Sequence, residues 1–101
     1  MELKFTPRNI VEIENETKTP IQEVLSGFSM KTVLLLVKKG SGIGTTDQEA
    51  ESKIEAYIAE GKDIIELYLD IMESLRDSGF LPRNLDTNSL RDKLKNVNTA
   101  Q

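Results

Sequence analysis

The sequence predicts an all-α protein, a compact single domain over residues 1–101 with about six short helices around a central helix at about 62–78. Three observations predict this class. Residues that begin and end helices recur along the chain at the spacing of short helices. Between these signals, apolar residues lie three or four positions apart, as on one face of a helix. The apolar run 33–37 also suits a buried strand, but no partner strand is visible, and Phe5 with its neighbours offers at most one short edge strand.

Two Thr-Pro pairs predict the first two helices. Thr6-Pro7 is typical of an N-cap followed by proline at the first helical position, which indicates a helix over about 7–16. Thr19-Pro20 repeats the signal, and Gln22 completes a capping box. We expect this second helix to end at Gly27-Phe28 in a left-handed cap. The residues expected to point into the core are Ile10, Val11, Ile13, Ile21, Val24 and Leu25.

Polar caps also predict the next two helices. Ser29 begins a helix over about 30–39, whose basic last turn suits the helix dipole. A flexible loop from Gly40 to Gly44 follows. Thr46 and Glu49 then form a capping box that opens a helix over about 47–60. We expect core positions in these two helices at Met30, Val33, Leu34, Leu36, Val37, Ala50, Ile54, Tyr57 and Ile58.

The helix over about 62–78 is the strongest element of the sequence. Its apolar residues cover more than half of its circumference, which indicates packing on two sides. Gly79-Phe80 ends it, and Asp86 caps a last helix over about 87–96, with a frayed tail from about 97. The remaining face of the central helix carries an acidic stripe, made of Asp63, Glu66, Asp70, Glu73 and Asp77.

The composition excludes several kinds of catalytic and metal site. The chain has no cysteine and no histidine, so it has no disulfides, thiolate zinc sites, cysteine nucleophiles or histidine-dependent triads. The acidic stripe lacks the histidines of di-metal helical bundles. The glycine loop at 40–44 lacks the spacing and the Lys-Ser/Thr ending of a phosphate-binding loop. We therefore expect no enzyme activity, cofactor or metal.

The distribution of charged and apolar residues argues against two classes of partner, nucleic acids and membranes. Residues 41–80 carry ten Asp or Glu against three Lys or Arg. An acidic middle argues against nucleic acid, because phosphate binding needs a concentrated basic surface. The longest apolar run, 33–37, is far shorter than a membrane span, so we expect no membrane partner and a cytoplasmic location. The acidic stripe is most simply a solvated helix face, with a partner-facing surface as the alternative.

The predicted helices carry more leucines than a single core-facing side can bury. Leu34, Leu35 and Leu36 are adjacent, so at least one must point away from the core. Leu67 and Leu69 in the central helix raise the same question, as does Val11. We therefore predict that one of these groups forms a protein-binding surface, for self-association or for a client.

Several short segments recur in a telling order and spacing over about residues 5–80. They are Phe5 to Ile13 with Glu12-Ile13-Glu14, Ser29-Met30-Lys31-Thr32-Val33, Lys39-Gly40, Gln48-Glu49-Ala50, Ile54-Glu55-Ala56-Tyr57-Ile58, Glu60-Gly61-Lys62-Asp63, Ile71-Met72-Glu73-Ser74-Leu75 and Gly79-Phe80. In this order and spacing the chain resembles the tail assembly chaperones of long-tailed (siphovirus-type) bacteriophages and prophages of Gram-positive hosts. The glycine loop at 40–44 is longer than the family pattern.

This resemblance implies a small helical protein of the host cytoplasm that is absent from the mature virion. Such chaperones coat the long tape measure protein until tail tube subunits polymerise around it, and they often self-associate. A longer form made by translational frameshifting engages the tail tube protein, and this chain would be the short form. The family implies no catalytic residues. The alternative is a small acidic regulatory or inhibitory protein that docks on a host or phage partner protein, with the stripe from Asp63 to Asp77 imitating phosphate charge.

Overall fold

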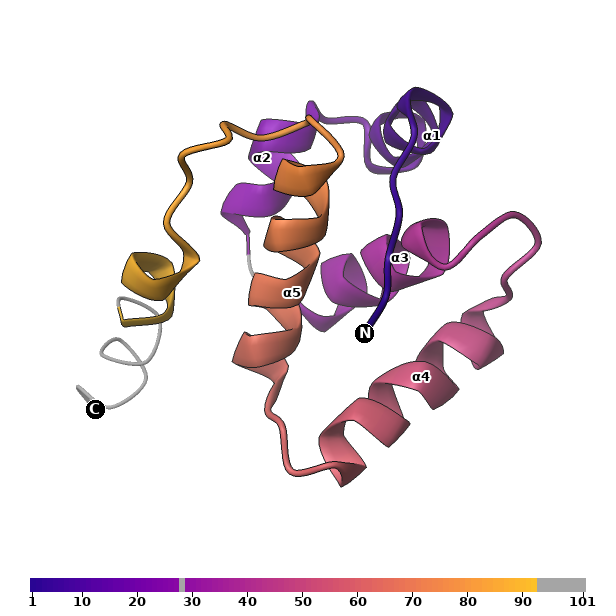
Figure 1. The fold of residues 1–101 in the computed structure, drawn as a ribbon. Helices are drawn as coiled ribbons and strands as arrows, with labels where there is room; N and C mark the ends of the chain where they lie inside the picture. The colour runs from indigo at the N-terminus through magenta and orange to yellow at the C-terminus, as the bar shows by residue number, and fades with distance from the viewer. Residues whose placement is uncertain (28, 93–101) are drawn as a thin grey trace.

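The computed structural model describes residues 1–27 and 29–92, and these residues form helices and no strands (Figure 1). The prediction of an all-α fold is thus confirmed. A further helical segment begins at residue 87 and reaches residue 92. The predicted end of that helix and the tail from 97 lie outside the described residues. The five complete helices are α1 (Pro7–Thr17), α2 (Ile21–Ser26), α3 (Met30–Gly40), α4 (Asp47–Ala59) and α5 (Ile64–Asp77).

The helices pack as two neighbouring pairs with α5 beside them. α1 contacts α2, and α3 contacts α4 (Figure 1). α3 joins the parts of the fold, because it also contacts α1 and α5. The radius of gyration is 13.2 Å. A globular domain of this length has a value of about 13 Å, so the chain is compact.

α5 buries the most side chains of the five helices. Six of its residues are buried, and Leu67, Ile71 and Leu75 have no exposed surface at all. This agrees with the wide apolar arc predicted for residues 62–78. The central position is shared with α3, which packs against three other helices and buries Val33, Leu36 and Val37 completely.

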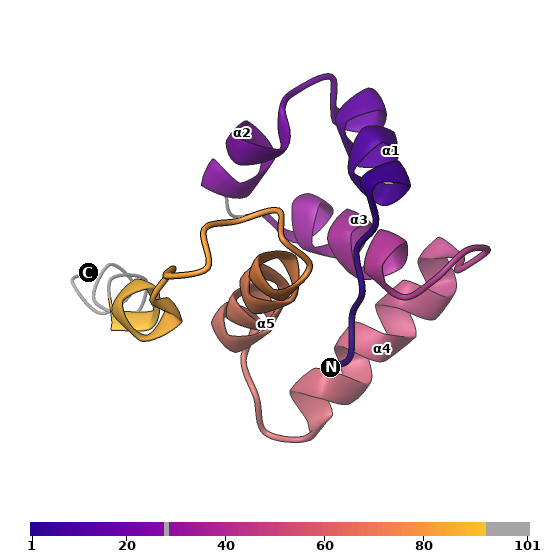
Figure 2. The ribbon, with the colours of Figure 1, turned by 45° about the horizontal axis from the view of Figure 1, so that its top comes forward.

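The N-terminal segment is extended and lies across α3 (Figures 1 and 2). The Lys4 amide donates a hydrogen bond to the Gly40 carbonyl oxygen at 2.9 Å, and the ring of Phe5 is buried. A Cβ atom at position 40 would lie 2.8 Å from Cζ of Phe5, closer than side-chain atoms approach. A glycine is therefore needed at position 40 for this close approach. Gly40 is the last residue of α3, so the predicted loop starts only at Ser41.

Most of the predicted helix starts are confirmed. The Thr6 and Thr46 hydroxyls accept from the backbone amides three residues later, and Ser29 does the same for α3. The capping box of Thr46 and Glu49 is present as predicted. The end of α5 is also as predicted: Gly79 has φ +94°, and the Phe80 amide donates to the Leu75 carbonyl at 2.9 Å.

The predicted end of the second helix at Gly27 is confirmed, but both of its predicted caps are wrong. Its N-cap is Pro20, without a side-chain cap bond, because the Glu14 carboxylate of α1 accepts from the Ile21 amide at 2.8 Å instead. Its C-cap Gly27 is extended, with φ −108°, and is not left-handed. A left-handed cap would satisfy free carbonyls at the helix end. Here the Tyr68 hydroxyl of α5 donates to the Leu25 carbonyl oxygen, so part of that role is taken by a distant residue.

Three residues predicted to face the core are on the surface: Val11, Met30 and Ile58. Val11 is 54% exposed, because the core face of α1 is formed by Ile10 and Ile13 on either side of it. Ile58 is 48% exposed, because Ile54 and Tyr57 form the buried face of α4 and no helix covers the position next to Tyr57.

Candidate protein-binding groove

The structure divides the five leucines of the predicted binding surface into two groups. Leu36, Leu67 and Leu69 are at most 1% exposed and belong to the core. The expectation that they lie on the surface is therefore corrected: Leu36 is on the buried face of α3, and α5 is covered on enough sides to bury both of its leucines. Leu34 and Leu35 are partly exposed, so the hypothesis of a binding surface depends on these two residues.

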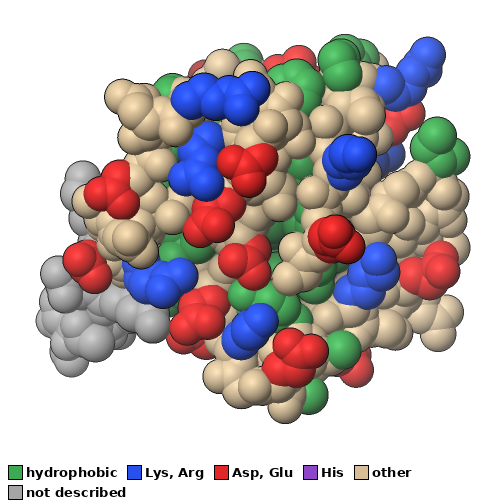
Figure 3. Space-filling model, in the orientation of Figure 1, with side chains coloured by type: hydrophobic (Ala, Val, Ile, Leu, Met, Phe, Trp, Pro, Cys, Tyr) green, Lys and Arg blue, Asp and Glu red, His purple; other side chains and the backbone are tan. Residues whose placement is uncertain are grey.

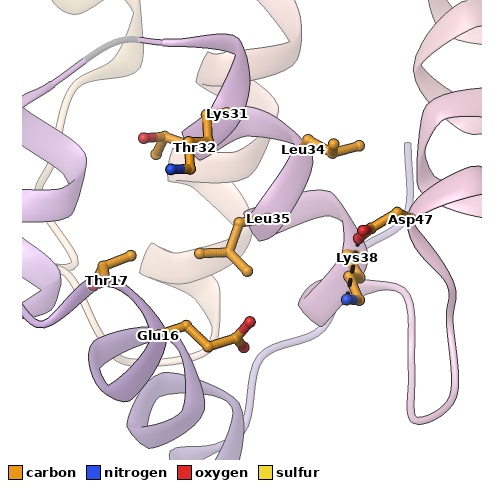
Figure 4. Close-up of a pocket in the computed structure, with 8 residues that line it drawn as sticks. All are labelled: Glu16, Thr17, Lys31, Thr32, Leu34, Leu35, Lys38 and Asp47. Carbon is orange, nitrogen blue, oxygen red and sulfur yellow. Dashed lines mark ion pairs between the residues drawn. The ribbon is translucent and has the colours of Figure 1, made fainter.

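Leu34 and Leu35 point to different sides of α3 (Figure 4). Leu35 points towards Glu16 and Thr17 of α1, whereas Leu34 points towards α4 (Figure 4). Both residues line a pocket of about 540 Å³. Lys38 and Asp47 also line it and form an ion pair, with 3.1 Å between Lys38 Nζ and Asp47 Oδ1. Much of this pocket is polar, because Lys31, Thr32, Lys38, Asp47, Glu16 and Thr17 all line it.

A second hollow of about 470 Å³ lies between α3 and α4, and we call it the α3–α4 groove. Its apolar residues are Met30 and Leu34 on α3 and Ile54 and Ile58 on α4. Met30 is 54% exposed, so the groove presents apolar side chains to solvent. Its remaining lining residues are Lys31 on α3 and Glu51 and Glu55 on α4.

The groove follows from the spacing of apolar residues on the two helices. Met30 and Leu34 are four positions apart, as are Ile54 and Ile58, so each pair forms a short ridge along its helix. The core faces of the two helices are formed mainly by Val33 and Leu36 on α3 and by Ala50 and Tyr57 on α4. Ile54 belongs to both sets, because it is buried in the core and also lines the groove. Sequence reasoning placed Met30 and Ile58 in the core and missed the groove.

The walls of the groove carry opposite charges. Lys31 stands on the α3 side, and Glu51 and Glu55 stand one turn apart on the α4 side. All three are exposed, and none forms an ion pair with another residue of the described part of the chain. Lys39, in contrast, is used within the fold: its Nζ lies 2.7 Å from Glu16 of α1 and 3.5 Å from Glu12. The hydrogen bond to Glu16 raises the pKa of Lys39.

The acidic stripe of α5 is engaged largely in contacts within the chain. Asp63 accepts from the Glu66 amide at 2.9 Å and caps the helix. Asp70 accepts from the Tyr57 hydroxyl of α4 at 2.6 Å, and Glu73 accepts from the Thr87 hydroxyl at 3.0 Å. On the face shown in Figure 3, acidic side chains gather in the middle and basic side chains lie around them. These bonds give Asp63, Asp70 and Glu73 of the stripe a structural role.

The Tyr57–Asp70 bond makes stability depend on alkaline pH. Burial, together with the hydrogen bond to Asp70, raises the pKa of Tyr57 above its usual range, and burial raises the pKa of Tyr68. The unfolded chain releases both protons near pH 10, whereas the folded chain retains them at higher pH. We therefore expect the free energy of unfolding to change little between pH 8 and about pH 10 and to fall above it. Urea titrations at pH 8, 10 and 11 measure this.

Tyrosinate absorbance gives the control for this prediction. Because Tyr57 and Tyr68 are the only two tyrosines, their ionisation is visible directly. We expect the tyrosinate signal to appear together with the loss of helical circular dichroism. Ionisation of both residues near pH 10 in a chain that is still folded would contradict the structure.

Two further properties concern the described residues, 1–27 and 29–92. They hold no group of three or more Asp, Glu, His or Cys side chains placed to bind a metal ion. None of their helices combines the length and the apolar character needed to cross a membrane.

Comparison with protein-family models, curated proteins and solved structures gave no match.

Proposed function

We propose that this chain is a tail assembly chaperone that acts without catalysis by binding an amphipathic helix of a phage tape measure protein in the α3–α4 groove. The observation that carries the proposal is the exposed apolar surface of Met30, Leu34 and Ile58 between two helices. Exposed apolar hollows with a polar rim are typical of sites that take the apolar face of a helix. The sequence resemblance supplies the identity of the client.

The mechanism follows from the chemistry of the groove. A tape measure protein is long and helical, and before the tail tube surrounds it, its apolar helix faces are exposed to solvent. A helix that lays its apolar face on Met30, Leu34, Ile54 and Ile58 removes both surfaces from water. The shallow groove covers only one side of such a helix. Tail tube subunits that enclose the helix would therefore displace the chaperone by offering a larger contact.

Co-expression tests this function. The chain is expressed with the tape measure protein of the genome that encodes it, and the soluble fraction is compared with that of the tape measure protein alone. We expect most of the tape measure protein to remain soluble and to co-purify with the chain, because binding removes aggregating apolar surface. A tape measure protein that is equally insoluble with and without the chain would contradict the proposal. A long gene of this kind directly downstream is the expected genomic context.

A further inference from the structure

We propose that the α3–α4 groove fixes the direction in which its partner helix lies, and that the partner is an amphipathic helix with acidic residues along one flank and basic residues along the other. The inference rests on the proposed function, because it assumes that the groove holds a helix. It adds a property of the partner that neither the resemblance nor the apolar surface provides.

The two walls of the α3–α4 groove carry charges of opposite sign. Lys31 lines the groove from α3, and Glu51 and Glu55 line it from α4, four positions apart on the same face of their helix. None of the three forms an ion pair with another described residue. The neighbouring Lys38, which does form one with Asp47, stays outside the groove lining. The two walls are therefore of opposite sign and free to pair with a bound helix.

A helix lying in the groove presents one flank to each wall. In one direction, acidic flank residues lie beside Lys31 and basic flank residues lie beside Glu51 and Glu55. Turning the helix end over end keeps its apolar face in the groove but exchanges the flanks, so that like charges meet at all three positions. Exposed ion pairs contribute little individually, but gaining three and avoiding three repulsions favours one direction by about tenfold or more. The charges thus select a direction, and the apolar residues provide most of the binding.

Two designed peptides test the inference. Each is an 18-residue helix with an apolar face at positions spaced by three and four, about 27 Å long. One has an acidic and a basic flank; the other has the same composition with the flanks exchanged. Each peptide carries a fluorescent donor at its N-terminus. The acceptor is attached to an Ala59→Cys chain, at the end of α4, where labelling is specific because the natural chain has no cysteine.

We expect both peptides to bind, and one to show high and the other low energy transfer. The charge-reversed chain Lys31→Glu/Glu51→Lys/Glu55→Lys should exchange the two results, and 1 M salt should bring them together by screening the charges. Equal transfer from both peptides, or transfer that charge reversal does not change, would overturn this inference and leave the proposed function intact.

Other outcomes would overturn both proposals. Absence of binding by either peptide, including the case in which a second copy of the chain fills the groove, would contradict a groove that is open to a partner helix. Binding that a Met30→Lys/Ile58→Lys chain retains at full strength would place the peptide on another surface. Energy transfer thus tests the direction of the bound helix, whereas peptide affinity tests binding in the groove, so a failure of one proposal can be told from a failure of the other.

Discussion

Replacing Leu36 with alanine is expected to lower the free energy of unfolding by about 3 to 4 kcal/mol, the largest effect of any substitution considered for this chain. Leu36 has no exposed surface and lies between α3 and the rest of the core. Alanine would remove its apolar contacts and leave a cavity that helices on several sides cannot collapse to fill. Small domains have total stabilities of about 5 to 15 kcal/mol, so this is a large fraction. Urea denaturation followed by helical circular dichroism measures it.

The neighbouring leucine is the matched control for this prediction. Leu34 is on the same helix but partly exposed, so Leu34→Ala should cost less than about 1 kcal/mol. If Leu36→Ala does not fold, Leu36→Met conserves volume and should cost less than about 1.5 kcal/mol. Equal losses in Leu34→Ala and Leu36→Ala would show that the division of these leucines into surface and core is wrong.

Adding charge to the α3–α4 groove should abolish client binding while leaving the fold intact. In the double variant Met30→Lys/Ile58→Lys, two unpaired ammonium groups would lie under the apolar face of the bound helix. Removing central apolar contacts commonly costs 2 kcal/mol or more, so we expect affinity for the tape measure protein to fall by at least about thirtyfold. Both positions are about half exposed, so stability should change by less than about 1 kcal/mol.

Val11→Lys is the control for the groove variant. Val11 is as exposed as Met30 but lies on α1 and does not line the groove. The substitution should leave both affinity and stability unchanged. If Val11→Lys weakened binding as much as the double variant does, exposed apolar residues in general, and not the groove, would be responsible. Titration calorimetry with a soluble tape measure fragment gives the affinities.

Much of the fold could be predicted because the signals are local. Thr46 with Glu49, and Gly79 with Phe80, need only their own backbone neighbours to begin or end a helix. Both caps of the second helix were predicted incorrectly, because residues of other helices bond to its ends. Glu14 and Tyr68 take those roles, and neither is recognisable as a cap without the fold.

The candidate site was less predictable for the same reason. Three adjacent leucines require that at least one be exposed, but the sequence does not say which, because that depends on where α1, α4 and α5 lie around α3. The groove combines Met30 of one helix with Ile58 of another, 28 positions later. Each residue alone suits a core position. The sequence signal for the groove was the two apolar pairs at positions 30/34 and 54/58. These pairs form one surface only because α3 packs against α4, which the sequence does not show.

Alkylation of single introduced cysteines shows which surface of the chain the client covers. The chain has no natural cysteine, so Ile58→Cys and Val11→Cys each introduce a single reactive thiol at similarly exposed positions. Alkylation rates are measured for each variant, alone and with saturating tape measure protein. If the client binds in the α3–α4 groove, it should slow alkylation of the Ile58→Cys chain by at least about tenfold and leave the Val11→Cys chain unchanged. Unchanged alkylation at position 58 in a complex that has formed would contradict binding in the α3–α4 groove.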